Sequence, residues 1–134
     1  MSRTDIQRKL RDHGVLPTAQ RLEVASVLLS RPQHLSADPI IEKLQDAGSG
    51  VSKATVYNTL KLFSETGLVK EINVDAMRRF YDSTTHPHHH FYHVETGELT
   101  DIPADEISIM DLPGLPTGTE QDGVDVLIRV RNKG

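Results

Sequence analysis

Five of the seven histidines of this chain fall within residues 86–93, and three of them are consecutive. If the segment is a β-strand, His88 and His90 lie on one face and His89 on the other, because side chains alternate along a strand. Two imidazoles on one face are the beginning of a site for a borderline divalent ion such as Fe(II), Mn(II) or Zn(II). The segment therefore predicts a metal centre to which other residues contribute.

Further ligands for such a centre are expected outside the histidine segment. We expect the carboxylates of Asp82 and Asp101 at the ends of flanking strands, and His34 at the start of a helix in the first half of the chain. Three imidazoles and two carboxylates would suit a five-coordinate ion. His13, near the end of a short polar helix, and His93, as a packed or hydrogen-bonded strand residue, are not predicted ligands. A solvent-exposed histidine run is the plainer alternative, and the position of the run among predicted strands disfavours it.

A second group of chemically useful side chains lies on the segment 52–61. With Val56 and Leu60 turned inward, this helix would expose Lys53, Thr55, Tyr57, Asn58 and Lys61. Such a face carries cations and hydroxyls for phosphates and an amide that can bond adenine. A merely solvated helix face is the alternative. The nearby Arg78 and Arg79 favour DNA binding over a merely solvated face.

The predicted secondary structure changes from helices to strands near residue 67. Helices are predicted over residues 4–13, after Thr18, from Ser36 to residue 48 and from Ser52 to Gly67, each beginning or ending at a residue typical of helix termini. Two strands follow, at 68–74 and 78–82. Helices followed by a hairpin predict a winged helix-turn-helix, with a generic helical domain carrying a hairpin as the alternative.

The second half is predicted to form strands at residues 90–94, 99–102 and 124–130. Residues 95–98 form the turn of a hairpin, and the prolines and glycines of residues 103–123 allow only a short helix there. A sheet of three strands is marginally stable alone and is expected to pair across a dimer. The predicted class is α+β, with a winged-helix DNA-binding domain at residues 1–83 and a small α/β dimerisation and metal-sensing domain at residues 84–134.

Composition supports two modules with different partners. Residues 1–82 hold 12 basic and 10 acidic side chains, whereas residues 83–134 hold 3 and 9. The absence of cysteine excludes disulfides, thiolate metal sites and cysteine catalysis. No apolar stretch approaches the roughly 20 residues that span a bilayer, and the N-terminus lacks a signal-peptide pattern. We therefore expect a cytoplasmic protein without a membrane partner.

Six short stretches occur in a characteristic order. They are Leu10-x-x-x-Gly14, Pro17-Thr18-x-Gln20-Arg21, His34-Leu35-Ser36-Ala37-Asp38, Ala54-Thr55-Val56-Tyr57-Asn58-Thr59-Leu60, Phe63-x-x-x-Gly67-Leu68-Val69 and Asp82-x5-His88-x-His90. Together they resemble the Fur family of bacterial metalloregulators over about residues 5–102. The resemblance implies a winged helix joined by a hinge to an α/β dimerisation domain.

The resemblance also implies functional positions. The regulatory metal site of the family would fall on His34, Asp82, His88, His90 and Asp101, the residues that the chemistry had suggested. The DNA-contacting positions would fall on Arg21, Thr55, Tyr57 and Asn58. The implied partners are a palindromic double-stranded operator and a second copy of the chain, as a dimer or a tetramer.

Departures from the family pattern indicate a particular branch. His93 and Thr96 stand where most members have a Cys-x-x-Cys pair, so a structural zinc tetrathiolate is impossible. The long dimerisation helix is replaced by residues 103–123. These features, with the consecutive His88, His89 and His90, resemble the iron response regulators, which respond to haem and control genes of haem synthesis and iron homeostasis. That resemblance implies haem at the three histidines and weaker DNA binding when haem is bound.

Three other functions remain as alternatives. The first is a Fur-family repressor that senses Fe, Mn or peroxide without haem. The second is a non-haem iron enzyme with two histidines, one carboxylate and an open position for substrate, which is disfavoured because so short a chain leaves little room for a substrate cavity. The third is a histidine-rich metal buffer that does not bind DNA.

Overall fold

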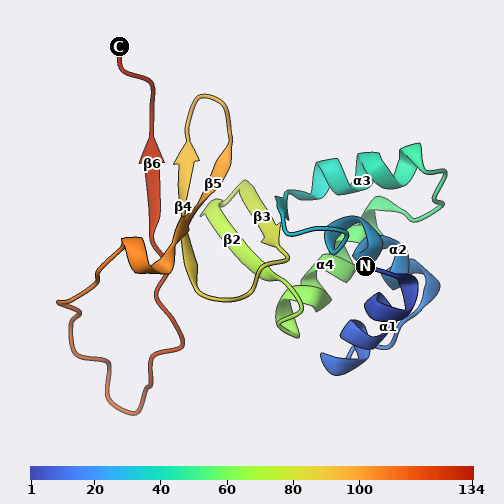
Figure 1. Ribbon diagram of the computed structural model, residues 1–134, viewed down its shortest axis with the longest axis horizontal. Helices are drawn as coiled ribbons and strands as arrows, with labels where there is room; N and C mark the ends of the chain where they lie inside the picture. The colour runs from blue at the N-terminus through green and yellow to red at the C-terminus, as the bar shows by residue number, and fades with distance from the viewer. The chain divides into compact units, whose positions relative to one another are not determined.

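The chain separates into two units, each with its own three-stranded sheet (Figure 1). The computed structural model describes residues 1–134, and the units comprise Met1–Thr85 and His86–Gly134. The boundary predicted after residue 83 falls in the same short connection between strands β3 and β4. None of the helices has the length and apolar character that crossing a membrane requires.

The first unit contains four helices: α1 (Arg3–Asp12), α2 (Ala19–Leu28), α3 (Ala37–Asp46) and α4 (Lys53–Glu65). Local hydrogen bonds explain where three of them begin. The side chains of Ser2, Thr18 and Ser52 each accept a hydrogen bond from the backbone amide three residues further on. Such caps satisfy amides that have no partner inside the helix. Ser36 occupies the same position before α3 but makes no side-chain capping bond.

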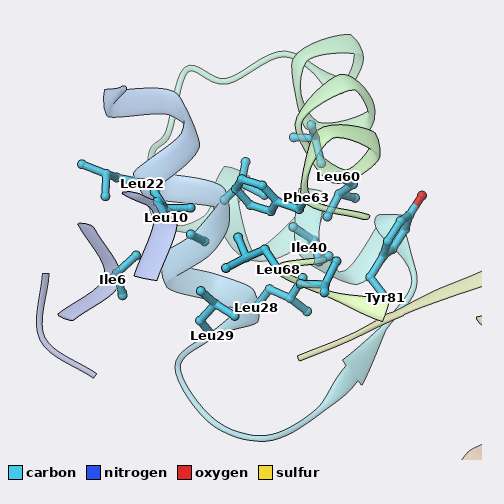
Figure 2. Packing of buried hydrophobic residues seen from close by; sticks show 14 of the residues in the cluster. Ile6, Leu10, Leu22, Leu28, Leu29, Ile40, Leu60, Phe63, Leu68 and Tyr81 are labelled. Carbon is cyan, nitrogen blue, oxygen red and sulfur yellow. The ribbon is translucent and has the colours of Figure 1, made fainter. Parts of the chain in front are cut away.

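The core of this unit joins all four helices to the strands that follow (Figure 2). Phe63 of α4 is fully buried, and it belongs to the same apolar cluster as residues of every other helix. The largest fully buried apolar side chains are Leu10, Val15, Val24, Leu28, Ile40, Val56, Leu60, Phe63, Leu68 and Val69. One face of α4 is thereby held against the core, and its opposite face is presented outward.

The sheet of the first unit has the order β1-β3-β2, with antiparallel pairing throughout. Strands β2 (Lys70–Asp75) and β3 (Arg78–Asp82) form the predicted hairpin directly after α4, so the winged-helix prediction is confirmed. The helix-start position expected for His34 is wrong. His34 lies in β1 (His34–Leu35), and α3 begins only at Ala37, because His34 pairs with Asp82 of β3.

The second unit has the order β5-β4-β6. Strands β4 (His88–His93) and β5 (Leu99–Pro103) form the predicted antiparallel hairpin, and a 3-10 turn, η1 (Ala104–Glu106), follows. Strand β6 (Leu127–Val130) pairs with β4 in parallel and is shorter than the predicted 124–130. A parallel partner requires the chain to return to the starting end of β4, and residues 107–126 make that return without a helix or strand. The α+β class is confirmed.

Candidate metal centre and nucleic-acid interface

Three of the predicted ligands meet on one face of the second unit; we call His88, His90 and Asp101 the His88 group. Asp101 is paired with His90 across β4 and β5, and His88 lies two residues away on the same face. The Asp101 Oδ1 atom is 3.5 Å from His88 Nε2 and 3.2 Å from His90 Nε2. A ligand atom from each residue lies within 4.8 Å of the other two. Asp101 therefore lies in the middle of β5, and its predicted place at a strand end is wrong.

A hydrogen bond to the backbone orients the ring of His88. His88 Nδ1 lies 2.8 Å from the backbone oxygen of His86. A carbonyl oxygen only accepts, so Nδ1 carries a hydrogen, and Nε2 lies 3.5 Å from Asp101 Oδ1. Metal-binding histidines commonly have this orientation, with one ring nitrogen donating to a carbonyl and the other directed toward the site.

The burial of the His88 group also favours a metal site. His88 and His90 are 5% and 4% exposed, whereas the Asp101 side chain is 55% exposed. The two rings contact each other with centroids 4.6 Å apart. Two buried imidazoles beside an accessible carboxylate form a donor set of nitrogen and oxygen that suits Fe, Mn or Zn.

His89 has a different role on the opposite face of β4, as its strand position predicts. Its Nδ1 accepts a hydrogen bond of 3.0 Å from the backbone amide of Val126, just before β6. The neutral ring therefore carries its hydrogen on Nε2, and neither nitrogen offers a lone pair while this bond is intact. His89 is 7% exposed and connects β4 to the β6 segment. This arrangement does not fit haem ligation by His89 unless the Val126 contact opens.

His93 and His13 are structural residues, as predicted. His93 Nδ1 accepts from the amides of Glu95 and Thr96, and Nε2 lies 2.8 Å from Asn132 Oδ1. His13 follows α1 and donates from Nδ1 to the Lys9 carbonyl at 2.8 Å.

The other two predicted ligands meet in the first unit; we call His34 and Asp82 the His34 pair. They are opposite each other in the register of β1 and β3. Asp82 is 1% exposed, and its Oδ1 accepts from the Thr84 amide at 2.9 Å. The His34 ring meets Phe80 edge-on, with centroids 6.1 Å apart. Within the first unit, the pairing of β1 with β3 is what brings His34 and Asp82 side by side.

The outward face of α4 carries the residues predicted to read DNA. Lys53, Tyr57, Asn58 and Lys61 are exposed. Thr55 is half-buried, and the Ser52 hydroxyl donates to its oxygen at 2.9 Å. The structure thus presents four of the five side chains to solvent, and their contact with DNA stays a prediction.

The remaining predicted DNA contacts already have internal partners. Arg21 is half-buried, and its Nη1 donates to the Leu16 carbonyl at 3.0 Å. Arg78 Nη1 is 3.4 Å from Asp75 Oδ2, and both side chains are about half exposed. Sequence reasoning overlooked Glu71, although strand alternation could have placed it on the same face of the hairpin as Arg79, with which it forms an ion pair of 2.7 Å.

Comparison with known proteins places these features in a family. Residues 12–112 match the pattern of the Ferric uptake regulator family. The peroxide-responsive repressor PerR of Staphylococcus aureus (strain USA300) is 34% identical over 93 residues, or 69% of this chain. That match spans only 63% of the length of PerR.

Solved structures of the same type resemble nearly the whole chain. The ferric uptake regulator of Pseudomonas aeruginosa, determined with manganese, superposes with a TM-score of 0.74 at 28% identity, covering 96% of this chain and 98% of that chain. The regulator of Francisella tularensis, determined with iron, gives a TM-score of 0.72 at 24% identity, covering 90% and 93%. The second likeness concerns the fold alone.

Proposed function

Because the chain belongs to the ferric uptake regulator family, we propose that it is a metal-responsive transcription regulator that binds double-stranded DNA as a homodimer. The observation that carries the proposal is the convergence of two buried imidazoles on one carboxylate oxygen, with His88 Nε2 and His90 Nε2 lying 3.5 and 3.2 Å from Asp101 Oδ1. The relatives are regulators, so we assign no enzymatic activity to the His88 group.

The ion is proposed to be Fe, Mn or Zn, held by His88, His90 and Asp101. The manganese in the similar regulator of Pseudomonas aeruginosa supports this choice of metals. We further propose that His34 and Asp82 complete the coordination. When bound, the ion would supply the positive charge that offsets the negative charge of the two carboxylates. The chain contains no cysteine, so no structural zinc tetrathiolate can form beside it.

Metal occupancy is proposed to control DNA affinity by linkage. An ion that uses ligands from both the His88 group and the His34 pair binds one arrangement of the protein more tightly than others. It therefore shifts the population toward that arrangement, and DNA that selects the same arrangement strengthens metal binding in return. Coupling of this kind typically changes affinity about 5- to 150-fold.

DNA is proposed to lie across the outward face of α4. Asn58 and Thr55 would contact base edges, and Tyr57 would contact the backbone or a base. The cations proposed to contact phosphates are Arg21, Lys53, Lys61 and Arg78. The second unit would form the dimer, or a tetramer, and two protomers would read the two halves of a palindromic operator. Such a regulator would work in the cytoplasm.

A narrower hypothesis concerns the signal. The consecutive histidines and the lack of cysteine support membership of the iron response regulator branch, with haem weakening DNA binding at genes of haem synthesis and iron homeostasis. Haem ligation through His89 would require loss of the Val126 hydrogen bond. The similarity to PerR supports the alternative of an Fe-, Mn- or peroxide-sensing repressor. The absorption spectrum of the protein with haemin, compared with that of a His88→Ala/His90→Ala variant, distinguishes them.

The DNA-binding part is tested separately from the metal part. A duplex selected from a random library by the wild-type protein serves as the operator. Tyr57→Ala should weaken binding to that duplex while Mn(II) affinity stays the same, because Tyr57 lies on α4, far along the chain from the His88 group. A Tyr57→Ala protein with unchanged DNA affinity would exclude Tyr57 from the DNA interface, whereas a wild-type protein that selects no duplex would favour the metal-buffer alternative.

A further inference from the structure

A groove of about 370 Å³ separates α4 from the β2–β3 hairpin within the first unit. Tyr57 and Lys61 line it from α4, while Glu71, Arg79 and Tyr81 line it from the hairpin. The ring of Tyr81 packs against the core, and Figure 2 shows its hydroxyl pointing away from the packed side chains. The groove therefore lies beside the residues proposed to contact DNA and has a polar side.

Arg79 is the hairpin residue that brings positive charge to this groove. Its side chain already has partners within the protein. Its Nε is 2.7 Å from Glu71 Oε1 and donates to Asn73 Oδ1 at 3.0 Å. The Arg79 guanidinium also acts on the Tyr81 hydroxyl, where it opposes the rise of the Tyr81 pKa that burial causes. The register places Asn73 directly opposite Arg79 and Glu71 opposite Tyr81, so the contacts follow from the pairing of β2 with β3.

The Glu71 contact differs from the other ion pairs of this surface. The Glu71 side chain is 28% exposed, whereas Lys61 and Glu65 are 76% and 60% exposed and are separated by 4.0 Å. A close, partly shielded pair is less screened by salt than a long, exposed one. Lys61 is thus free to move to a phosphate, while Arg79 must first leave a carboxylate.

We propose that Glu71 is an intramolecular competitor for DNA phosphate: it occupies Arg79 and so withholds a backbone contact that the hairpin would otherwise make to any sequence. Carboxylate and phosphate use the same donors of a guanidinium. In this role Glu71 limits the sequence-independent part of DNA affinity, and it acts through Arg79 as a positioning residue. The inference rests on the proposed DNA binding.

Removal of the carboxylate should release this contact. In Glu71→Gln, Arg79 should gain one phosphate per bound protomer. Each phosphate contact steepens the plot of log affinity against log salt by about 0.9. The variant should therefore lose about 3.5-fold more affinity per protomer than the wild type between 50 and 200 mM salt.

The experiment measures binding of the full chain to a fluorescent 30-base-pair duplex of random sequence by anisotropy at a series of salt concentrations. Four variants are compared with the wild type: Glu71→Gln, Arg79→Gln, the double variant, and Glu65→Gln as the matched control. Glu65→Gln removes the same charge from the same groove but frees only Lys61, which is already mobile. Far-ultraviolet circular dichroism confirms that each variant is folded.

The inference predicts a steeper salt dependence for Glu71→Gln alone. The double variant and Arg79→Gln should match the wild type, because Arg79 is needed for the gain and is occupied in the native protein. An equal gain in Glu65→Gln, or a gain that persists in the double variant, would show a general charge effect and overturn the inference. Wild-type protein that binds no duplex at any salt would overturn the proposed function as well.

Discussion

Replacing His88 and His89 separately should divide the histidine run into a metal ligand and a structural residue. His88→Ala removes a nitrogen that faces Asp101, whereas His89→Ala removes the acceptor of the Val126 amide. The two side chains are adjacent and almost equally buried, so the comparison is well matched. His86→Ala serves as the control, because His86 is exposed and its contribution to His88 comes from its backbone oxygen.

The expected magnitudes follow from these contacts. Loss of a residue that only orients a metal ligand costs about 10- to 100-fold in metal affinity, so loss of the His88 ligand should cost at least about 100-fold. At a Mn(II) concentration 100 times the wild-type Kd, the ion should stabilise the wild type by about 2.7 kcal/mol but His88→Ala by only about 0.4 kcal/mol. His89→Ala leaves the partly buried Val126 amide without this partner, which costs at most about 1–3 kcal/mol with or without metal.

The assay is urea unfolding in Mn(II) and in excess EDTA. His89→Ala should have a lower free energy of unfolding in both conditions and keep the metal-induced gain. His88→Ala should lose most of that gain, and His86→Ala should behave as the wild type. The reasoning is refuted if His89→Ala loses the Mn(II) effect while His88→Ala retains it.

Three further predictions concern the first unit. Phe63→Ala should lower the free energy of unfolding by about 3–5 kcal/mol, because Phe63 is fully buried at the centre of the core; a loss below about 1 kcal/mol in urea would contradict this packing. Ser52→Ala should cost about 1 kcal/mol by removing the cap of α4, whereas Ser52→Thr, which keeps the hydroxyl, should cost less. Burial raises the pKa of the Tyr81 phenol above its ordinary value, so the stability that it contributes is complete below about pH 10 and is lost as the pH rises through the raised pKa. Tyr81→Phe should therefore show a shallower alkaline loss of stability in urea titrations at pH 9–11, and an unchanged profile would assign that loss to other groups.

Local signals in the sequence were sufficient for the helices of the first unit. Thr18 and Ser52 predict helix starts because a cap needs only its own side chain and an amide three residues later. His34 was misplaced because its strand exists only through pairing with β3, almost 50 residues further along the chain. The same applies to Asp101, whose place in the middle of β5 depends on its register with His90.

The chemistry of the candidate site was only partly predictable. Alternation along a strand predicts that His88 and His90 share a face and that His89 is opposite. The role of each Nδ1 atom as donor or acceptor depends on the His86 carbonyl and the Val126 amide, which are contacts of folded backbone. The return of residues 107–126 to form a parallel β6 likewise depends on tertiary pairing. The sequence therefore predicts which side chains share a face of the sheet. It does not predict which ring nitrogen donates or accepts a hydrogen bond.

The most direct test of the central claim measures DNA affinity as a function of the metal. The wild type and the His88→Ala/His90→Ala variant are titrated onto the selected duplex at one salt concentration, in Mn(II) and in EDTA. The account predicts that Mn(II) strengthens wild-type binding at least about fivefold and leaves the variant unchanged. Equal wild-type affinity in Mn(II) and EDTA, or a variant that keeps the full metal effect, would contradict control of DNA binding by an ion at the His88 group.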